Sequence, residues 1–314
     1  MSTGQLVPLR LRSRLLKGNP MGNSTLREAL VYTPPGFSKR ERLPCVFWLP
    51  GFGSGPKKWS EKDFPMHRLV DYLILSGQLP RVVMVCLDGS TKLGGSQYVD
   101  SSLNGPFATH IVEEWVPKIE KDFGVVGPHV ICGHSSGGFG SLHLGTLFSD
   151  MFHRVGSFGG DLHFELTHKN MLADLVNDLE RGKIESSLRG NLRESKTHYV
   201  LGLGAAYSPT PRNKTWGMDL PIHPTTAEIN ERVWEQWLSF DPLNWKKGRF
   251  SQLKKLDRLY LNAGDQDQFQ LHLGVKAFEA RCRREGVKFR TEFFPTNHSL
   301  LHRQVEEGLK ALLN

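Results

Sequence analysis

The stretch 129–141, HVICGHSSGGFGS, decides the predicted fold. A short apolar run leads into Gly133, and apolar residues spaced for one face of a helix follow Ser135. This order predicts a strand, a sharp turn with Ser135 at its apex, and a helix. Strand and helix backbones cross closely at such a turn, so side chains at Gly133 and Gly137 would block the crossing. The pattern is typical of a nucleophile elbow, and the alternative is an ordinary glycine-rich turn.

The composition is that of a globular chain without a membrane span. Of the 314 residues, 39% are hydrophobic and 23% are charged, and no run approaches the roughly 18 apolar residues of a transmembrane helix. The formal net charge is +8. The basic residues are scattered, however, without a basic helix stripe interleaved with aromatics, so we expect no nucleic-acid partner. The N-terminal stretch lacks the apolar core of a secretion signal, and we expect a cytoplasmic protein.

The four cysteines give no sign of a metal or redox site. They stand at 45, 86, 132 and 282, and no pair has the spacing of a metal-binding or redox motif. We expect small buried side chains in a reducing compartment. No other pattern in the chain indicates a metal ion or an organic cofactor, so we expect neither.

Apolar runs alternate with amphipathic stretches along most of the chain. Continuous apolar runs, rather than alternating ones, predict strands that are covered on both faces. We expect strands at 45–49, 82–87, 130–132, 155–158, 259–261 and 289–294, and helices near 63–77, 111–119, 139–147, 168–181, 227–239, 271–282 and 301–312. Residues 9–33 predict a leading strand pair, and the Gly-, Ser- and Asn-rich residues after Asp88 predict a loop. The alternation indicates the α/β class, with a mostly parallel central sheet flanked by helices.

The segment 161–250 interrupts this alternation. It separates two strands that otherwise follow each other, and it is longer than an ordinary crossover. We expect a single domain over 1–314, with 161–250 as an insertion over the carboxyl edge of the sheet, where a substrate would enter. The alternative is a set of connecting helices that do not contact substrate.

Two late loops could supply the partners that a nucleophilic serine needs. A serine hydroxyl requires a base to take its proton and an acid to hold that base. Asp265 and Asp267 follow one predicted strand, and His298 follows the last one. Carboxyl ends of parallel strands meet at one edge of a sheet, so these groups can approach Ser135. We expect His298 to be the base, and the alternative is that it is only a histidine of a surface loop. Asp267, which begins the loop proper, is preferred to Asp265.

The reaction of such a serine also needs two donors for the developing oxyanion. One is the amide of Ser136, at the start of the predicted helix. The other should come from the loop after the strand at 45–49, where glycines let the backbone approach a substrate. The amide of Phe52 is our first choice for this donor and that of Gly53 the second. The alternative is that this is a glycine-rich loop that donates to no oxyanion.

With these residues in place, the chain resembles the putative-esterase family of α/β-hydrolases. That family includes enterochelin esterase, S-formylglutathione hydrolase, feruloyl esterase and the mycolyltransferases. The likeness runs from about residue 15 to the end of the chain. Its most specific stretches are VYTPPG at 31–36, LPGFG at 49–53, GHSSGG at 133–138, NAGDQD at 262–267 and NH at 297–298.

The resemblance implies an α/β-hydrolase fold and assigns roles residue by residue. The nucleophile, acid and base of the family fall on Ser135, Asp267 and His298, and its oxyanion amides fall on Phe52 and Ser136. Two positions depart from the pattern. Many members have histidine where this chain has Pro50, and many have methionine where it has Ser136. Neither change removes a backbone amide, but both alter the surroundings of the acyl pocket.

We therefore expect a serine carboxylic-ester hydrolase that acts on a small-molecule ester through an acyl-enzyme. One alternative is an acyltransferase with the same acyl-enzyme, and another is a catalytically silent binding protein on this fold. The stretch 205–243 resembles a subgroup that is known only as enterochelin-esterase-like. The resemblance thus indicates the reaction, but neither the ester nor the oligomeric state.

Overall fold

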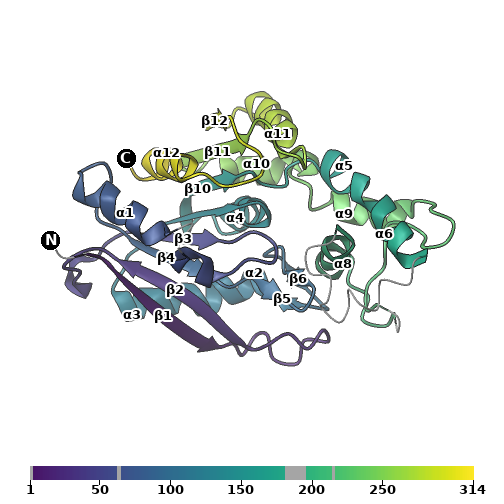
Figure 1. The fold of residues 1–314 in the computed structure, drawn as a ribbon, viewed down its shortest axis with the longest axis horizontal. Coiled ribbons are helices and arrows are strands. Elements are labelled where there is room, and N and C mark those ends of the chain that lie inside the picture. Colours follow the sequence, from purple (N-terminus) through teal and green to yellow (C-terminus); the bar gives the residue numbers. More distant parts are fainter. Residues whose placement is uncertain (1–2, 62–64, 181–195, 214–215) are drawn as a thin grey trace.

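The structure is a computed structural model that describes residues 3–61, 65–180, 196–213 and 216–314. Figure 1 shows a central sheet with helices on both faces and a group of further helices at one end. Phe64, which the sequence places at the start of a helix, lies outside the described residues.

The central sheet of this part of the chain has eight strands in the order β1-β2-β4-β3-β9-β10-β11-β12. Six neighbouring strands, from β4 to β12 in that order, run parallel to one another. At one edge, β2 runs antiparallel to both of its neighbours, β1 and β4. The mostly parallel α/β sheet and its leading strand pair are therefore confirmed. The strands are β1 (Gln5–Arg12), β2 (Leu26–Thr33), β3 (Cys45–Leu49), β4 (Val83–Leu87), β9 (His129–His134), β10 (Phe152–Phe158), β11 (Arg258–Gly264) and β12 (Arg290–Phe294).

The helices follow the expected order with shifted ends. Helix α1 begins after Pro65 and stops before Gly77, which has a φ of +73°. Helix α9 begins four residues later than expected, because the Asn230 side chain caps it by accepting from the amide of Val233. The α-helices of the described residues are α1 (Met66–Leu75), α2 (Phe107–His110), α3 (Val116–Phe123), α4 (Ser136–Leu147), α5 (Phe164–Thr167), α6 (Leu172–Glu180), α8 (Lys196–Tyr207), α9 (Glu231–Leu238), α10 (Lys247–Leu253), α11 (Leu271–Glu285) and α12 (His302–Leu313), and a π-helical stretch, Ile111–Trp115, joins α2 to α3.

Both faces of the sheet are covered, which explains the continuous apolar runs. Every residue of β3 is buried. On one face Phe47 belongs to a core cluster with residues of α3, α4 and α11, and on the other face Trp48 packs with residues of α1 and α12. Two layers of helices therefore enclose the strands.

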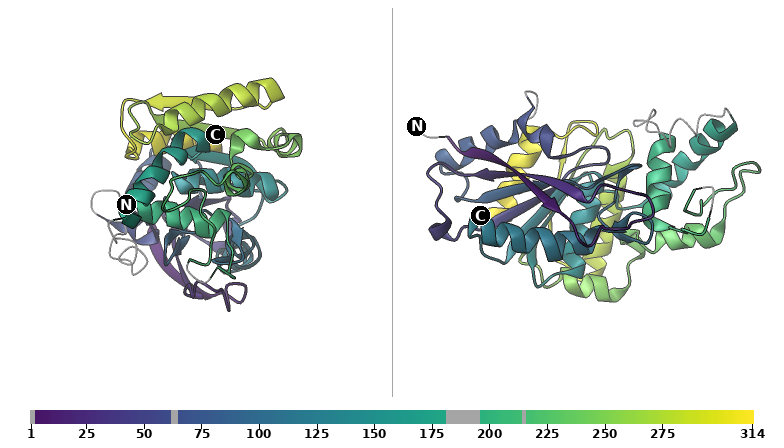
Figure 2. Two further views of the ribbon diagram at one scale, coloured as in Figure 1. Left: turned by 90° about the vertical axis from the view of Figure 1, so that its right-hand side faces the viewer. Right: turned by 90° about the horizontal axis from the view of Figure 1, so that it is seen from below.

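The segment between β10 and β11 carries α5, α6, α8, α9 and α10. Figure 2 shows α5, α6, α8 and α9 gathered at one end of the sheet, where the parallel strands have their carboxyl ends. These helices share a core cluster of their own, which includes Tyr207, Trp234 and Trp237 and is joined by Phe139 of α4. The boundaries of one domain over 1–314 and of an insertion at 161–250 remain predictions.

The loop after β4 holds two small ladders that the sequence did not predict. β5 (Ser90–Thr91) pairs with β6 (Gly94–Gly95), and β7 (Asp100–Ser101) pairs with β8 (Gly105–Pro106). Each strand has only two residues, which is too short to leave an apolar pattern in the sequence.

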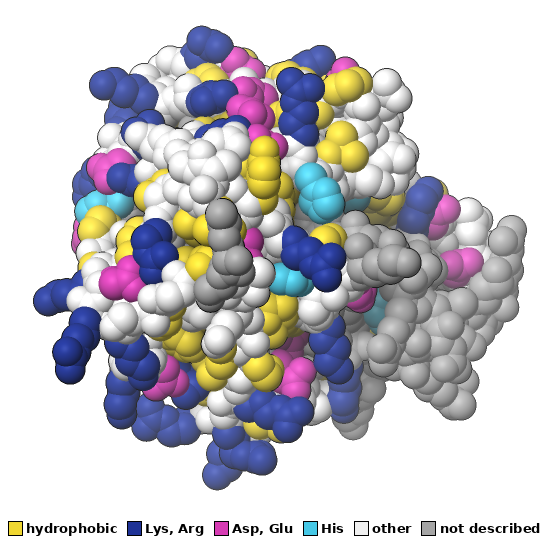
Figure 3. Space-filling view, turned by 60° about the vertical axis from the view of Figure 1, so that its left-hand side comes forward, with side chains coloured by type: hydrophobic (Ala, Val, Ile, Leu, Met, Phe, Trp, Pro, Cys, Tyr) yellow, Lys and Arg dark blue, Asp and Glu magenta, His cyan; other side chains and the backbone are white. Residues whose placement is uncertain are grey.

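The surface and the thiols show the expected distribution. Figure 3 shows Lys and Arg side chains spread among acidic and neutral ones over one face. All four cysteines are free and buried, and burial raises the pKa of each thiol. Among the described residues, no helix combines the length and the apolar character needed to span a bilayer.

Candidate active site

The turn between β9 and α4 has the tight geometry that its glycines predict. Ser135 has φ 56° and ψ −123°, a conformation that non-glycine residues rarely adopt. A Cβ at Gly133 or at Gly137 would overlap the carbonyl oxygen of Leu49 in the neighbouring strand β3. The backbones can therefore cross here only because both residues lack a side chain.

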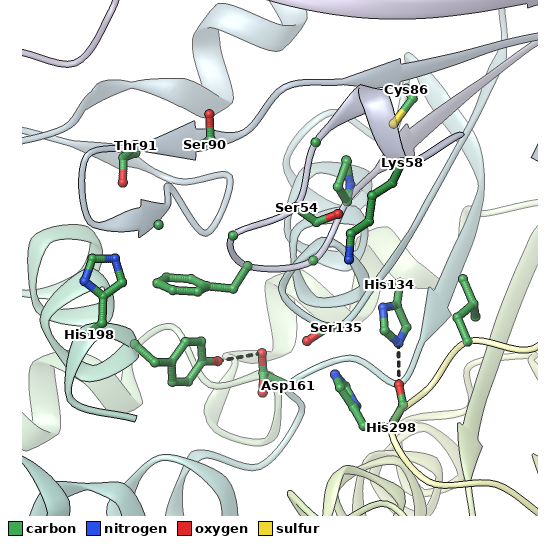
Figure 4. Close-up of a pocket in the computed structure, with 18 of the residues that line it drawn as sticks. Ser54, Lys58, Cys86, Ser90, Thr91, His134, Ser135, Asp161, His198 and His298 are labelled. Atoms are coloured by element: carbon green, nitrogen blue, oxygen red, sulfur yellow. Dashed lines mark hydrogen bonds between the residues drawn. The ribbon is translucent and has the colours of Figure 1, made fainter. Parts of the chain in front are cut away.

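Backbone hydrogen bonds hold Ser135 in this conformation. Its amide donates to the carbonyl of Phe158 at the end of β10, over 2.9 Å. Its carbonyl accepts from the amides of Gly138 at 2.7 Å and Phe139 at 3.0 Å, the first hydrogen bonds of α4. The turn is thus anchored on two sides, while the Ser135 hydroxyl lines a pocket (Figure 4).

Asp267 and His298 meet at this edge of the sheet. His298 Nδ1 lies 2.7 Å from Asp267 Oδ2, and the backbone amide of His298 donates to the Gln268 side chain over 3.0 Å. Asp267 is 2% exposed, and its second oxygen accepts from the Phe269 amide over 2.8 Å. Burial would raise the pKa of Asp267, but the contact with His298 and the amide bond outweigh it and lower this pKa. The carboxylate is therefore ionised and fixes Nδ1 as the protonated nitrogen.

A close backbone approach brings these two loops together. A Cβ at Gly264, the last residue of β11, would overlap the carbonyl oxygens of Thr296 and Asn297. Asp265 follows directly, and its side chain is exposed at the surface. Of the two aspartates that the sequence offered, Asp267 is the one in contact with His298.

His134 is a site residue that sequence reasoning missed. Its Nε2 lies 3.1 Å from the backbone carbonyl of His298, and the two rings lie 4.8 Å apart (Figure 4). Desolvation, helped by the neighbouring His298, lowers the pKa of His134 to about 3. The ring is therefore neutral, and Nε2 must carry the proton that it donates to the carbonyl. The only feature of the sequence that could have indicated a role for His134 in the site is its position directly before Ser135.

The loop after β3 passes close to Ser135. The amide of Ser54 donates to the carbonyl of Gly51 over 3.1 Å, which closes a turn with Gly53 at φ +68°. A Cβ at Gly51 would lie 3.2 Å from that of Ser135. The amide of Phe52 donates to no other group within the described chain, which leaves it available to a ligand.

The ring of Phe52 holds this loop in place. It occupies a notch where a Cβ at Gly94, Gly95 or Gly202 would collide with it. It also packs edge-on against Tyr199 of α8, with ring centroids 4.8 Å apart. Ser136, the other expected donor, is the first residue of α4, where backbone amides have no partner within the helix. The two amides thus come from the loop after β3 and from the N-terminus of α4.

Ser135, His134, His298 and the loop of Phe52 line one pocket of about 1110 Å³. Ser135, His298 and Phe52 come from the sheet side, while His198 and Tyr199 come from α8 in the segment 161–250. Figure 4 shows a ring nitrogen of His298 pointing towards Ser135. Residues of the predicted insertion therefore form part of the pocket wall.

Asp161 is a second residue that the sequence did not single out. It follows β10, lines the same pocket and is only 4% exposed. Its Oδ2 accepts from the Tyr199 hydroxyl over 3.1 Å. Burial raises the pKa of Asp161 to about 6, against the opposing effect of nearby His298.

Within the described ranges, no group of three or more His, Cys, Asp or Glu side chains is arranged to hold a metal ion.

Comparisons with known proteins identify the family and show the same fold in solved structures. The model of the Esterase family, described as "Putative esterase", matches residues 24–299. A ferulic acid esterase superimposes with a TM-score of 0.67 at 19% identity, covering 100% of this chain and 98% of that one. An S-formylglutathione hydrolase from Agrobacterium tumefaciens gives 0.62 at 15% identity, with 99% and 97% covered. The fluorophosphonate-binding serine hydrolase FphF of Staphylococcus aureus gives 0.65 at 14% identity, with 99% of both chains covered.

Proposed function

Since the chain belongs to the "Putative esterase" family, we propose that it is a serine esterase in which Ser135, His298 and Asp267 hydrolyse a carboxylic ester as nucleophile, base and acid. The observation that carries this proposal is the 2.7 Å contact between buried Asp267 and His298, beside a strained serine in the same pocket. An ionised acid, an oriented imidazole and a hydroxyl that lines the pocket are the three groups that acyl transfer to water requires.

In the first step, the Ser135 oxygen attacks the ester carbonyl carbon while His298 Nε2 takes the hydroxyl proton. Asp267 accepts from Nδ1 and stabilises the imidazolium that forms. The carbonyl oxygen becomes an oxyanion, which the amides of Phe52 and Ser136 stabilise. When the carbon–oxygen bond to the alcohol breaks, His298 gives its proton to the leaving oxygen, and Ser135 is left acylated.

In the second step, His298 takes a proton from water, and the resulting nucleophile attacks the acyl-enzyme. The bond to the Ser135 oxygen breaks, His298 returns the proton to it, and the acid product leaves. An alcohol in place of water would give acyl transfer by the same route. Product analysis with an added alcohol measures how the acyl-enzyme divides between the two.

The proposal is tested by labelling with an active-site-directed phosphonate and by rates with p-nitrophenyl esters. We expect Ser135 to be labelled, and Ser135→Ala and His298→Ala each to lower kcat by at least about 10⁴-fold. Ser251→Ala and His153→Ala, which change residues of the same types outside the pocket, serve as controls. A wild-type protein that is neither labelled nor active on any ester would favour the silent binding protein instead.

A further inference from the structure

Asp161 differs from the other buried carboxylates of this fold in how few donors it has. Asp71 accepts from the Gly4 amide with both oxygens and from the Tyr32 hydroxyl. Asp241 likewise accepts from two backbone amides and one side-chain amide. Within the described chain, Asp161 accepts one hydrogen bond, from Tyr199, and its Oδ1 accepts none. A carboxylate buried for structural reasons alone would be saturated in the same way as the other two.

Tyr199 fixes the direction of this carboxylate. Its ring packs edge-on against Phe52 on one side and against His168, at 5.7 Å, on another. Its hydroxyl has a single proton, which it gives to Asp161 Oδ2. The second oxygen therefore keeps its lone pairs for a donor that comes from the pocket. Asp161 and Ser135 line the same pocket (Figure 4), and His298 lies near enough to Asp161 to interact with its charge, so such a donor would lie near the reacting carbonyl.

The charges around the pocket decide between a hydroxyl and an ammonium donor. Three lysines, Lys58, Lys92 and Lys196, line the pocket against two acidic side chains, Asp161 and Glu61. Of these lysines only Lys196 has an ion-pair partner, Asp174, within the described residues. Unpaired lysines at a pocket wall repel a cationic substrate. A neutral hydroxyl donates to a carboxylate without meeting this repulsion, and hydrogen bonds to a charged acceptor are among the strongest available.

We propose that Asp161, oriented by Tyr199, is a specificity-determining residue that accepts a hydrogen bond from an aliphatic hydroxyl group of the ester substrate, close to the ester carbonyl. The substrate class is therefore hydroxylated esters. This inference rests on the proposed ester hydrolysis, because it concerns the substrate of that same pocket.

The test compares kcat/KM for matched esters. Ethyl β-hydroxybutyrate and the hydroxyethyl ester of butyrate carry the hydroxyl in the acyl and the alcohol part, and ethyl butyrate lacks it. We expect the wild type to prefer one hydroxylated ester over ethyl butyrate by about 10- to 100-fold, since the unhydroxylated ester leaves a buried acceptor unpaired. Asp161→Ala should bring this ratio close to one, and Tyr199→Phe should lower it severalfold.

Asp257→Asn changes an exposed aspartate outside the pocket and should leave the ratio as in the wild type. Three results would overturn the inference: equal rates with all three esters, a higher rate with ethyl β-aminobutyrate than with its hydroxy analogue, or an equal loss on every ester in Asp161→Ala. If no ester is hydrolysed by the wild type, the proposed function itself fails. If the melting temperature of Asp161→Ala shows that this variant folds poorly, the same ratio of kcat/KM values is measured on Tyr199→Phe and Asp161→Asn instead.

Discussion

The substitution Asp161→Asn should stabilise the protein at neutral pH. Asn has the shape of Asp and can still accept from Tyr199, but it carries no charge that would have to be desolvated. Burial raises the pKa of Asp161 from 3.8 to about 6 in the folded state. At about 1.4 kcal/mol per pKa unit, the ionised carboxylate destabilises the native state by about 3 kcal/mol.

The sign of the pH dependence follows from this raised pKa. Above pH 6 both the folded and the unfolded chain carry the ionised carboxylate, and the destabilisation is complete. As the pH falls from about 6 towards 3.8, the folded chain binds the proton first, so the contribution of Asp161 to stability rises. The advantage of Asp161→Asn should therefore be largest near about pH 7.5 and disappear near about pH 4.

The assay is the melting temperature of wild type and variant across this pH range. With an unfolding entropy of about 2.1 cal/mol/K per residue, about 3 kcal/mol corresponds to an increase of about 4–5 °C. Asp257→Asn, at an exposed position, is the control for loss of an aspartate charge. Asp241 has a similarly raised pKa, but it is present in every variant and cancels in the comparison. A variant that melts below the wild type at about pH 7.5, or whose shift does not depend on pH, would refute the reasoning.

Three further substitutions test the geometry of the site. In Gly202→Ala the new methyl group would overlap the carbonyl oxygen of Leu93 and the ring of Phe52, so the loop after β3 must shift and we expect kcat for a p-nitrophenyl ester to fall by about 10- to 100-fold; Gly248→Ala, where a Cβ meets nothing within 4 Å, is the matched control. His134→Ala removes the donor to the His298 carbonyl and should lower kcat about tenfold with KM nearly unchanged, whereas an effect on KM alone would contradict a positioning role. Gly137→Ala should prevent folding, since its Cβ would overlap strand β3, and a folded variant with normal circular dichroism would contradict the crossing geometry.

Much of the fold could be predicted because its signals are local. Continuous apolar runs marked the buried strands, and glycines at 133 and 137 marked the turn. Asp267 and His298 could be placed together because carboxyl ends of parallel strands share one edge, whatever the details of the loops. Helix ends were less well predicted, since a cap such as the one from Asn230 depends on one side-chain rotamer.

The rest of the site depends on contacts between distant parts of the chain. The hydrogen bond between Tyr199 and Asp161 joins residues 38 positions apart, on α8 and after β10. The notch around Phe52 is built from glycines at 94, 95 and 202, none of which stands in a recognisable motif. His134 contacts the backbone carbonyl of His298. Since every residue type has this carbonyl, the identity of residue 298 could not indicate the contact. Such contacts leave no period or spacing in a sequence.

One chain of contacts connects the oxyanion loop with the proposed specificity residue. Phe52 packs on Tyr199, and Tyr199 donates to Asp161. A substrate hydroxyl that engages Asp161 would therefore hold Tyr199 in the position that supports the Phe52 loop. Residues in contact do not act additively, so Tyr199→Phe and Gly202→Ala combined should cost less than the product of their separate effects on kcat/KM. Binding and the stabilisation of the oxyanion would then depend on the same face of α8.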